Sequence, residues 1–167
     1  MRGMRAVGIF LSLMAIVWGA ENLEVTADKF THLEKEQKAI FQGHAHATQG
    51  ASWIKAKKFV VYFDKENNAK EYQAMGNVNF EIVKKPDRDV KGQCDKLLYK
   101  VAEDSYRLIG HAVVDDRVNH RLMKGDEIFL DNKRGLARAT SGKKGPVKFV
   151  FPMKDAQGAK KKKRGKY

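Results

Sequence analysis

The chain has 167 residues, of which 33 are Lys or Arg and 20 are Asp or Glu, so its formal net charge is +13. This length suits one domain, and a hydrophobic share of 43% is enough for a packed core. A single cysteine excludes an intramolecular disulfide framework and an all-cysteine metal cluster. The charge favours a polyanionic partner, which could be nucleic acid, a membrane surface or a phosphorylated ligand.

The N-terminus has the order of a secretory signal peptide. A short basic stretch, residues 1–5, precedes the mostly apolar and uncharged residues 6–18, and small residues follow at Gly19 and Ala20. A membrane-spanning helix needs about 20 apolar residues, so this segment is short for an anchor. We therefore expect residues 1–20 to be a cleaved signal peptide that exports the protein, with an uncleaved anchor as the alternative.

The body of the chain, residues 21–153, alternates apolar and polar residues with a period of two, which predicts half-buried β-strands. One strand signature occurs three times, and a second occurs between its copies, so that each unit is a strand pair of about 33 residues. Turn-forming segments rich in Asn, Asp, Gly and Pro separate the pairs. The first signature covers residues 41–47, 74–80 and 108–114, with Gly43, Gly76 and Gly110 at matching positions that suggest bulges.

This repeat predicts an all-β stack in which each unit buries its apolar face against the next. The second signature covers residues 27–30, 56–62, 92–99 and 125–130. Residues 136–141 and 147–151 form a partial last copy, which we expect to close the array.

The repeats resemble those of the OstA/LptA-type lipopolysaccharide-transport proteins over roughly residues 23–151. The opening segment, residues 23–30, resembles the first strand of that family, and residues 41–47 resemble the second. The resemblance implies a twisted β-jellyroll, or β-taco, in which antiparallel strand pairs fold around an apolar groove. It also implies a periplasmic, non-enzymatic protein that holds the acyl chains of lipid A in this groove.

The resemblance further implies partners at both ends of the molecule. These are an inner-membrane LptC-like protein, an outer-membrane LptD-like translocon and further copies of the chain, added head to tail through edge strands. Exposed edges normally invite aggregation, but a bridge would use them to add strands of its partners. The candidate edge residues are Leu23, Val25 and Ala27 in the first strand and Val147, Phe149 and Phe151 in the last.

The inward faces of the strands supply the candidate groove. Alternation alone fits an ordinary sandwich core equally well, and the resemblance favours the groove. Burying hydrocarbon is worth about 25 cal/mol per Å², so an acyl chain needs such a surface, and small side chains would leave it room. The candidate groove residues are Phe41, Ala45, Ala47, Ala74, Val78, Phe80, Ile82, Leu108, Ala112, Val114, Ile128, Leu130, Phe149 and Phe151.

Much of the net charge lies at the C-terminus. Residues 158–167 contain six basic residues and no acidic one, and without them and the first twenty residues the net charge is +5. A block of like charges repels itself, so we expect residues 154–167 to be a disordered tail. Its candidate phosphate contacts are Lys160, Lys161, Lys162, Lys163 and Arg164, and a merely solubilising tail is the alternative. The predicted signal peptide argues against nucleic acid as the partner.

The sequence predicts neither a metal or cofactor site nor catalysis. His44 and His46 lie on the polar face, and His111 occupies the same position in its repeat as His44 does. No carboxylate or cysteine occurs at this position in any copy, so the residues do not form a metal-ligand set. The acidic pairs at 115–116 and 126–127 are strand neighbours that face opposite sides, and no catalytic motif is present. A lipopolysaccharide-transport bridge is therefore the leading hypothesis. A membrane-anchored LptC-like component and a protein-only β-repeat adaptor are the alternatives.

Overall fold

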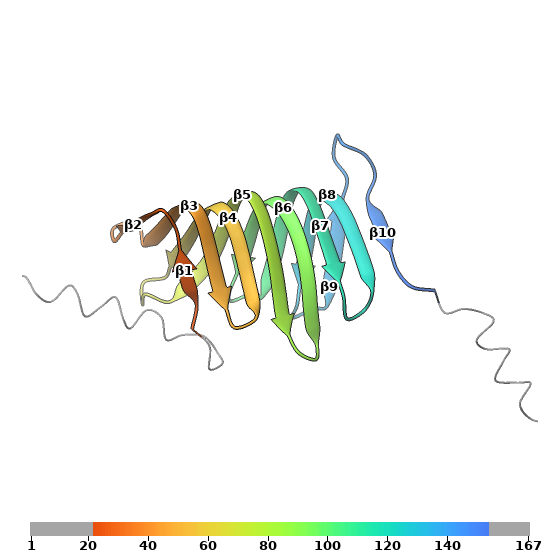
Figure 1. The fold of residues 1–167 in the computed structure, drawn as a ribbon, viewed down its shortest axis with the longest axis horizontal. Helices are drawn as coiled ribbons and strands as arrows, with labels where there is room; N and C mark the ends of the chain where they lie inside the picture. The colour runs from red at the N-terminus through yellow and green to blue at the C-terminus, as the bar shows by residue number, and fades with distance from the viewer. Residues whose placement is uncertain (1–21, 154–167) are drawn as a thin grey trace, which may run out of the picture.

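The computed structural model describes residues 22–153, which form ten β-strands (Figure 1). The strands are β1 (Glu24–Thr26), β2 (Lys29–Leu33), β3 (Lys38–Gln49), β4 (Ser52–Phe63), β5 (Ala69–Lys84), β6 (Arg88–Lys100), β7 (Ser105–Asp116), β8 (Arg121–Asp131), β9 (Leu136–Thr140) and β10 (Lys148–Val150). Within the described range no helix is long and apolar enough to cross a membrane. The predicted signal peptide and basic tail lie outside the described residues.

All strands belong to one antiparallel sheet, in which β3 to β8 pair in chain order. At one end β1 and β2 both pair with β3, and at the other β9 and β10 both pair with β8. The long strands bend in the middle, so the sheet folds into two facing halves (Figure 1). We call them the β1–β10 half and the β2–β9 half, after the short strands at their ends. The predicted all-β jellyroll of antiparallel strand pairs is confirmed.

The bends occur where two consecutive residues of β3, β5 and β7 have positive φ angles and the register with the neighbouring strand shifts. The pairs are Gly43–His44, Gly76–Asn77 and Gly110–His111. Glycine adopts this left-handed conformation without steric cost, and Asn and His tolerate it better than most residues. The repeated glycines of the sequence therefore fold the sheet, and we call the line of bends the spine.

Side chains of the neighbouring chain segment lie directly over the glycines of the spine. Asp28 lies over Gly43 and Asp95 over Gly110, where an added Cβ would come within 2.4 and 2.2 Å of a carboxylate oxygen. Lys57 lies in the same way over Gly76. At Gly43, Gly76 and Gly110 a larger residue therefore has no room unless these neighbouring side chains move.

The spine also corrects one expectation about the first strand. The sequence predicted a single strand over residues 23–30, but the chain breaks between β1 and β2, at Ala27 and Asp28. The backbone N–H of Asp28 donates to the carbonyl of Gly43 at 2.8 Å, so the break lies beside the bend of β3. The first strand therefore bends at the spine as the later ones do, and β1 and β2 are its two parts.

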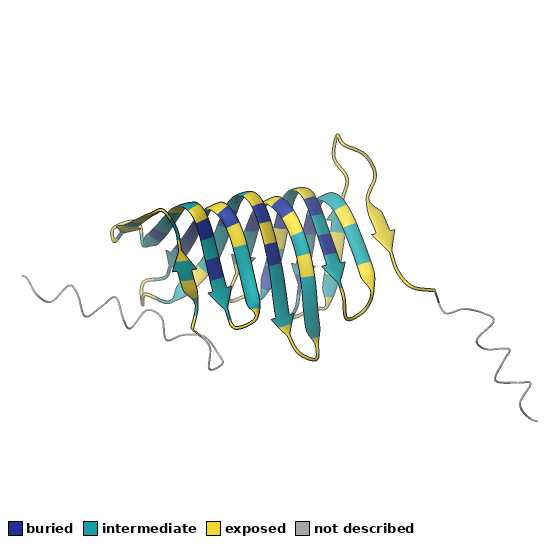
Figure 2. Ribbon diagram, viewed as in Figure 1, coloured by how far each residue is buried: buried dark blue, intermediate teal, exposed yellow. Residues whose placement is uncertain are grey.

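The core lies between the two halves and runs along the whole sheet (Figure 2). Buried residues alternate with exposed ones along the strands, as the period of two predicts. The most deeply buried large side chains are Leu108, Ile128 and Val78, at 0, 0 and 1% exposure. Leu108 and Ile128 lie on β7 and β8 in the β2–β9 half, and Val78 lies on β5 in the β1–β10 half. All three belong to one apolar cluster, so the two halves pack against each other.

Candidate functional site

The space between the two halves is the candidate site, and its middle is filled by the chain's own side chains. Twelve of the fourteen predicted groove residues belong to, or pack against, a single apolar cluster. The fully buried ones are Ala45, Ala47, Ala74, Val78, Phe80, Leu108, Ala112, Val114 and Ile128, and the partly buried ones are Phe41, Ile82 and Leu130. Phe149 and Phe151 are 46 and 52% exposed at the C-terminal end.

The interior widens into a cavity of about 530 Å³ at the C-terminal end, between β6 to β8 and the end strands β9 and β10. Only three of the predicted groove residues, Val114, Leu130 and Phe149, line it. Val90, Met123 and Ala139 also line it and were missed by the sequence reasoning. The alternation could have identified two of them, because Val90 pairs with the inward-facing Ile82 and Met123 pairs with the inward-facing Val114.

The rim of this cavity is charged. Arg88 and Arg121 lie on it together with Asp87, Asp116 and Asp131. Two of the acids are engaged locally: Asp116 accepts hydrogen bonds from the Asn119 side chain and backbone, and Asp131 accepts them from Arg134. An apolar chamber with a charged rim suits an amphiphile, whose tails it buries while the head stays at the surface.

A ladder of stacked tyrosines forms part of the inner wall of the β2–β9 half. The rings of Tyr72 and Tyr99 have centroids 6.0 Å apart, and those of Tyr99 and Tyr106 are 4.4 Å apart. Burial raises the pKa of all three, that of Tyr106 to about 12, so the phenols are neutral at physiological pH. The ladder is therefore an aromatic wall rather than a set of acid–base groups.

Cys94 lies in the core of the β1–β10 half, where its exposure is 4%. Burial is the main cause that raises the pKa of its thiol to about 12, and the nearby charge of Asp95 adds to it. The reactive form of a cysteine is the thiolate, so a buried neutral thiol is inert. Because it is the only cysteine of the chain, its reactivity reports directly on access to the core.

At about pH 8 we expect Cys94 to react with a maleimide on the order of a thousandfold more slowly in the native protein than in concentrated urea. The rate in the native protein should keep rising about tenfold per pH unit beyond pH 9, since the thiol stays protonated until its raised pKa. A stopped-flow or mass-spectrometric time course measures this. A rate that levels off near pH 9, as for a free thiol, would show that Cys94 is exposed.

The ends of the sheet carry the predicted partner strands. Leu23, Val25 and Ala27 at the first edge are half-buried against the core, whereas Val147, Phe149 and Phe151 at the last edge are exposed. In the described part of the chain, β1 and β2 pair only with β3, and β9 and β10 only with β8. Both ends therefore present unpaired backbone edges.

The predicted polar-face histidines lie outside the core. On the spine, His44 Nδ1 is 2.7 Å from Asp28 Oδ2, and His111 Nδ1 is 2.9 Å from Asp95 Oδ2. His46 instead packs edge-on against Trp53, with ring centroids 6.5 Å apart. Among residues 22–153, no three or more His, Cys, Asp or Glu side chains are placed to hold a metal ion. The predicted phosphate contacts at 160–164 lie outside the described residues.

The chain is similar to known proteins in both sequence and fold. The family model described as "LptA/(LptD N-terminal domain) LPS transport protein" matches residues 24–136. Among solved structures, the chain is similar to LptH from Pseudomonas aeruginosa, described as the LptA-homologous periplasmic component of the lipopolysaccharide transport device. That match has a TM-score of 0.67 and 21% identity, and covers 78% of this chain and 95% of LptH. No curated protein matches the chain.

Proposed function

Because the chain belongs to the LptA and LptD N-terminal domain family of lipopolysaccharide transport proteins, we propose that it is a periplasmic bridge between the inner-membrane and outer-membrane parts of the export machinery. The family is one of transport proteins and not of enzymes. The observation that carries the proposal is the apolar cavity at the C-terminal end, which continues the core between the two halves. The predicted cleaved signal peptide supports the periplasmic location.

The acyl chains of lipid A enter this cavity and lie against Val114, Met123 and Leu130. Each Å² of hydrocarbon removed from water contributes about 25 cal/mol, so a chamber of this size favours acyl chains over polar ligands. Arg88 and Arg121 on the rim contact the phosphates of the head group, and the lysines at 160–164 add further phosphate contacts. The sugars remain in water.

Passage along the rest of the interior requires the two halves to move apart, since the space between them is closed by buried side chains such as Val78, Leu108 and Ile128. The strands of the β2–β9 half stay paired during this movement, because neighbouring turns of this half are tied together by hydrogen bonds. The Gln37 side chain donates to the carbonyl of Asp64, and Asn132 donates to both the carbonyl and the carboxylate of Asp104. The small residues Ala74 and Ala112 then leave room for a chain between the halves.

The bridge extends by adding strands at both ends. A head-to-tail copy places its β2 antiparallel to β9 and its β1 antiparallel to β10, which continues the alternation of the sheet. Phe30 of β2 and Ala139 of β9 belong to the same row of inward-facing residues across the sheet. When β2 of one copy pairs with β9 of the next, the exposed Phe30 ring therefore lies over the small Ala139 side chain. LptC-like and LptD-like partners carrying the same fold would use the same two edges.

A photo-crosslinking amino acid at Met123 tests lipid binding, with one at Leu122 as the matched control. Met123 lines the cavity, and Leu122 is its neighbour on the same strand with the opposite orientation. We expect a light-dependent adduct with lipopolysaccharide at position 123 and none at 122. If neither position captures lipopolysaccharide while crosslinkers on β1 and β10 still capture proteins, the protein-only adaptor replaces the bridge. An intact Met1 on the exported protein would favour the membrane-anchored LptC-like alternative.

A further inference from the structure

The outer face of the β2–β9 half carries large apolar side chains that do not belong to the core cluster. They occupy two rows that cross the sheet side by side, two residues apart along each strand. These side chains are Ile40, Val60, Met75, Leu98, Ile109 and Phe129. Val60 has 2% exposure and the others are partly buried, so an apolar surface lies among the polar side chains of this face.

Lysines alternate with other residues in the row nearer the spine. Lys58, Met75 and Lys96 lie opposite one another on β4, β5 and β6. Lys29 lies in the same row on β2, separated from Lys58 by Gln42 of β3. We call this series, Lys29, Lys58 and Lys96, the lysine row. One lysine therefore stands on every second strand from β2 to β6.

The lysine row has no acidic partner of its own. Within residues 22–153, Lys29, Lys58 and Lys96 form no ion pair. The nearest acid in the same row, Glu127 on β8, is engaged by Arg107, whose Nη1 lies 3.1 Å from Oε1. An anion placed along the lysine row would therefore gain attraction without displacing an existing ion pair.

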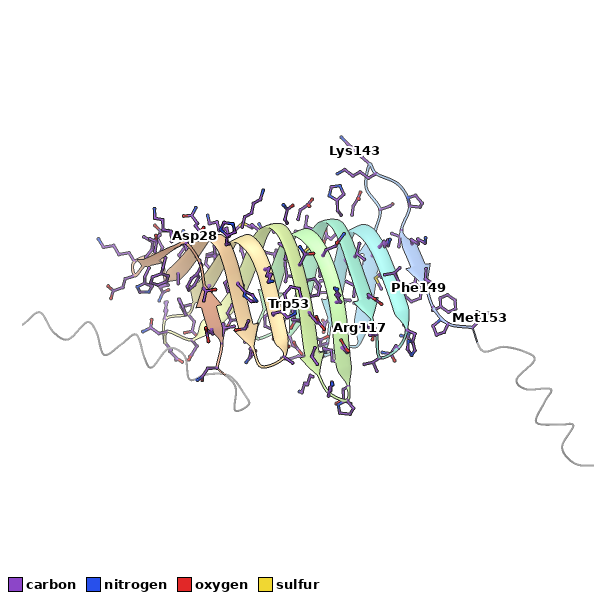
Figure 3. The ribbon with its side chains drawn as sticks, in the orientation of Figure 1. Asp28, Trp53, Arg117, Lys143, Phe149 and Met153 are labelled. Atoms are coloured by element: carbon purple, nitrogen blue, oxygen red, sulfur yellow. The ribbon has the colours of Figure 1, made fainter. Side chains whose placement is uncertain are left out.

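The outer face of the β1–β10 half differs, and Trp53 and Arg117 mark it in Figure 3. There Trp53 Nε1 donates to Glu81 Oε2 at 3.2 Å, and Arg117 lies against both Glu81 and Asp89. The two matching rows of this face contain the bases Lys55, Lys91, Lys124 and Lys148 and the acids Glu24, Glu81 and Asp115. Acids and bases are thus mixed on this face, whereas the lysine row is uncompensated.

The spacing of the lysine row fits an extended polypeptide. Neighbouring strands lie about 4.8 Å apart, so successive lysines of the row, two strands apart, are separated by about 10 Å. A polyproline II segment has three residues per turn and rises about 3.1 Å per residue, so every third side chain recurs after about 9 Å. An acidic residue at every third position would therefore meet successive lysines.

The apolar row and the twist of the sheet narrow the choice of partner. Val60 and Leu98 lie two residues beyond Lys58 and Lys96 on the same strands, so an apolar residue beside each acid would cover them. An acidic polysaccharide lacks such side chains. A planar bilayer cannot follow the face, because adjacent strands are rotated by about 20–25°. A second copy would present the same positive charge to this face.

We propose that the outer face of the β2–β9 half binds an extended segment of a partner protein, which lies across the strands. Acidic residues at every third position of the segment contact the lysine row, and apolar residues lie against Val60 and Leu98. Because this face is separate from the interior and from both edges of the sheet, binding here is independent of lipopolysaccharide transport.

Fluorescence anisotropy with labelled synthetic peptides tests the proposal on the purified protein. The probe is Glu-Pro-Leu repeated three times. One control has the same composition with its three acids adjacent, and another has Lys in place of Glu. We expect the probe to bind at least about fivefold more tightly than the first control, and the second control not to bind. Equal binding of the probe and the first control, or no binding of the probe at about 1 mM, would overturn the proposal.

Substitutions locate the binding face. Lys58→Gln with Lys96→Gln should weaken binding of the probe at least about fivefold and reduce its salt dependence. Lys55→Gln with Lys124→Gln is the matched control, since it removes the same charge from the outer face of the other half, and it should leave binding unchanged. Leu98→Gln should weaken binding without changing its salt dependence. Thermal melting checks that each variant is folded.

Two other patterns would contradict the proposal. If the matched control weakens binding as much as Lys58→Gln with Lys96→Gln does, net charge alone attracts the probe. If Lys58→Gln with Lys96→Gln abolishes binding to phosphatidylglycerol vesicles but leaves binding of the probe unchanged, the lysine row serves a lipid surface. The lipopolysaccharide crosslink at Met123 reports on the interior, so the two proposals can fail separately.

Discussion

Leu108→Ala is expected to lower the free energy of unfolding by about 3–4 kcal/mol, among the largest effects of any single truncation in this protein. Leu108 lies in β7, has 0% exposure and is paired across the sheet with Leu97 and Ile128. Neighbours on both sides belong to paired strands that cannot collapse into the space, so the substitution leaves a cavity as well as losing apolar burial. Urea titration followed by circular dichroism measures the change.

Ile109→Ala is the matched control for this prediction. Ile109 is the next residue of the same strand, points to the outer face and is only partly buried. Its truncation should cost less than half as much. If the two variants were equally destabilised, the assignment of inner and outer faces in the β2–β9 half would be wrong.

The sequence predicted the repeat and the inner faces of β3, β5 and β7 because these strands alternate cleanly. It assigned no faces where apolar residues are consecutive. Phe59, Val60 and Val61 are all buried, yet only Phe59 and Val61 belong to the core cluster, while Val60 lies on the outer row beside Ile40. Three apolar residues in a row fit either register, so periodicity could not assign these faces.

The bending of the sheet was implied by the family resemblance but not by the periodicity of the sequence. The glycine repeat suggested bulges, but nothing local says that bulges in successive strands align into one spine or that the two halves then face each other. The cavity depends on this alignment, since Val90 of the β1–β10 half and Ala139 of the β2–β9 half meet only after the sheet has folded. Long-range geometry of this kind is set by tertiary contacts.

The second large effect concerns the spine: Gly110→Ala is expected to lower the free energy of unfolding by about 2–3 kcal/mol. Gly110 has a φ of +80°, a conformation that costs an L-residue about 1–2 kcal/mol. The new Cβ would also lie 2.2 Å from Asp95 Oδ2 and 2.9 Å from its Cβ, so Asp95 must move away from His111. Chemical denaturation of the variant gives the total cost.

Gly135→Ala separates the backbone cost from the steric one, because Gly135 also has a positive φ, of +62°, but nothing within 4 Å of an added Cβ. It should cost only the conformational part, about 1 kcal/mol. Adding Asp95→Ala to Gly110→Ala removes most of the side chain that the new Cβ meets, so the double variant should recover toward the Gly135→Ala value. If the double variant recovers nothing, the close contact across the spine does not constrain Gly110, and backbone conformation alone explains why glycine is needed there.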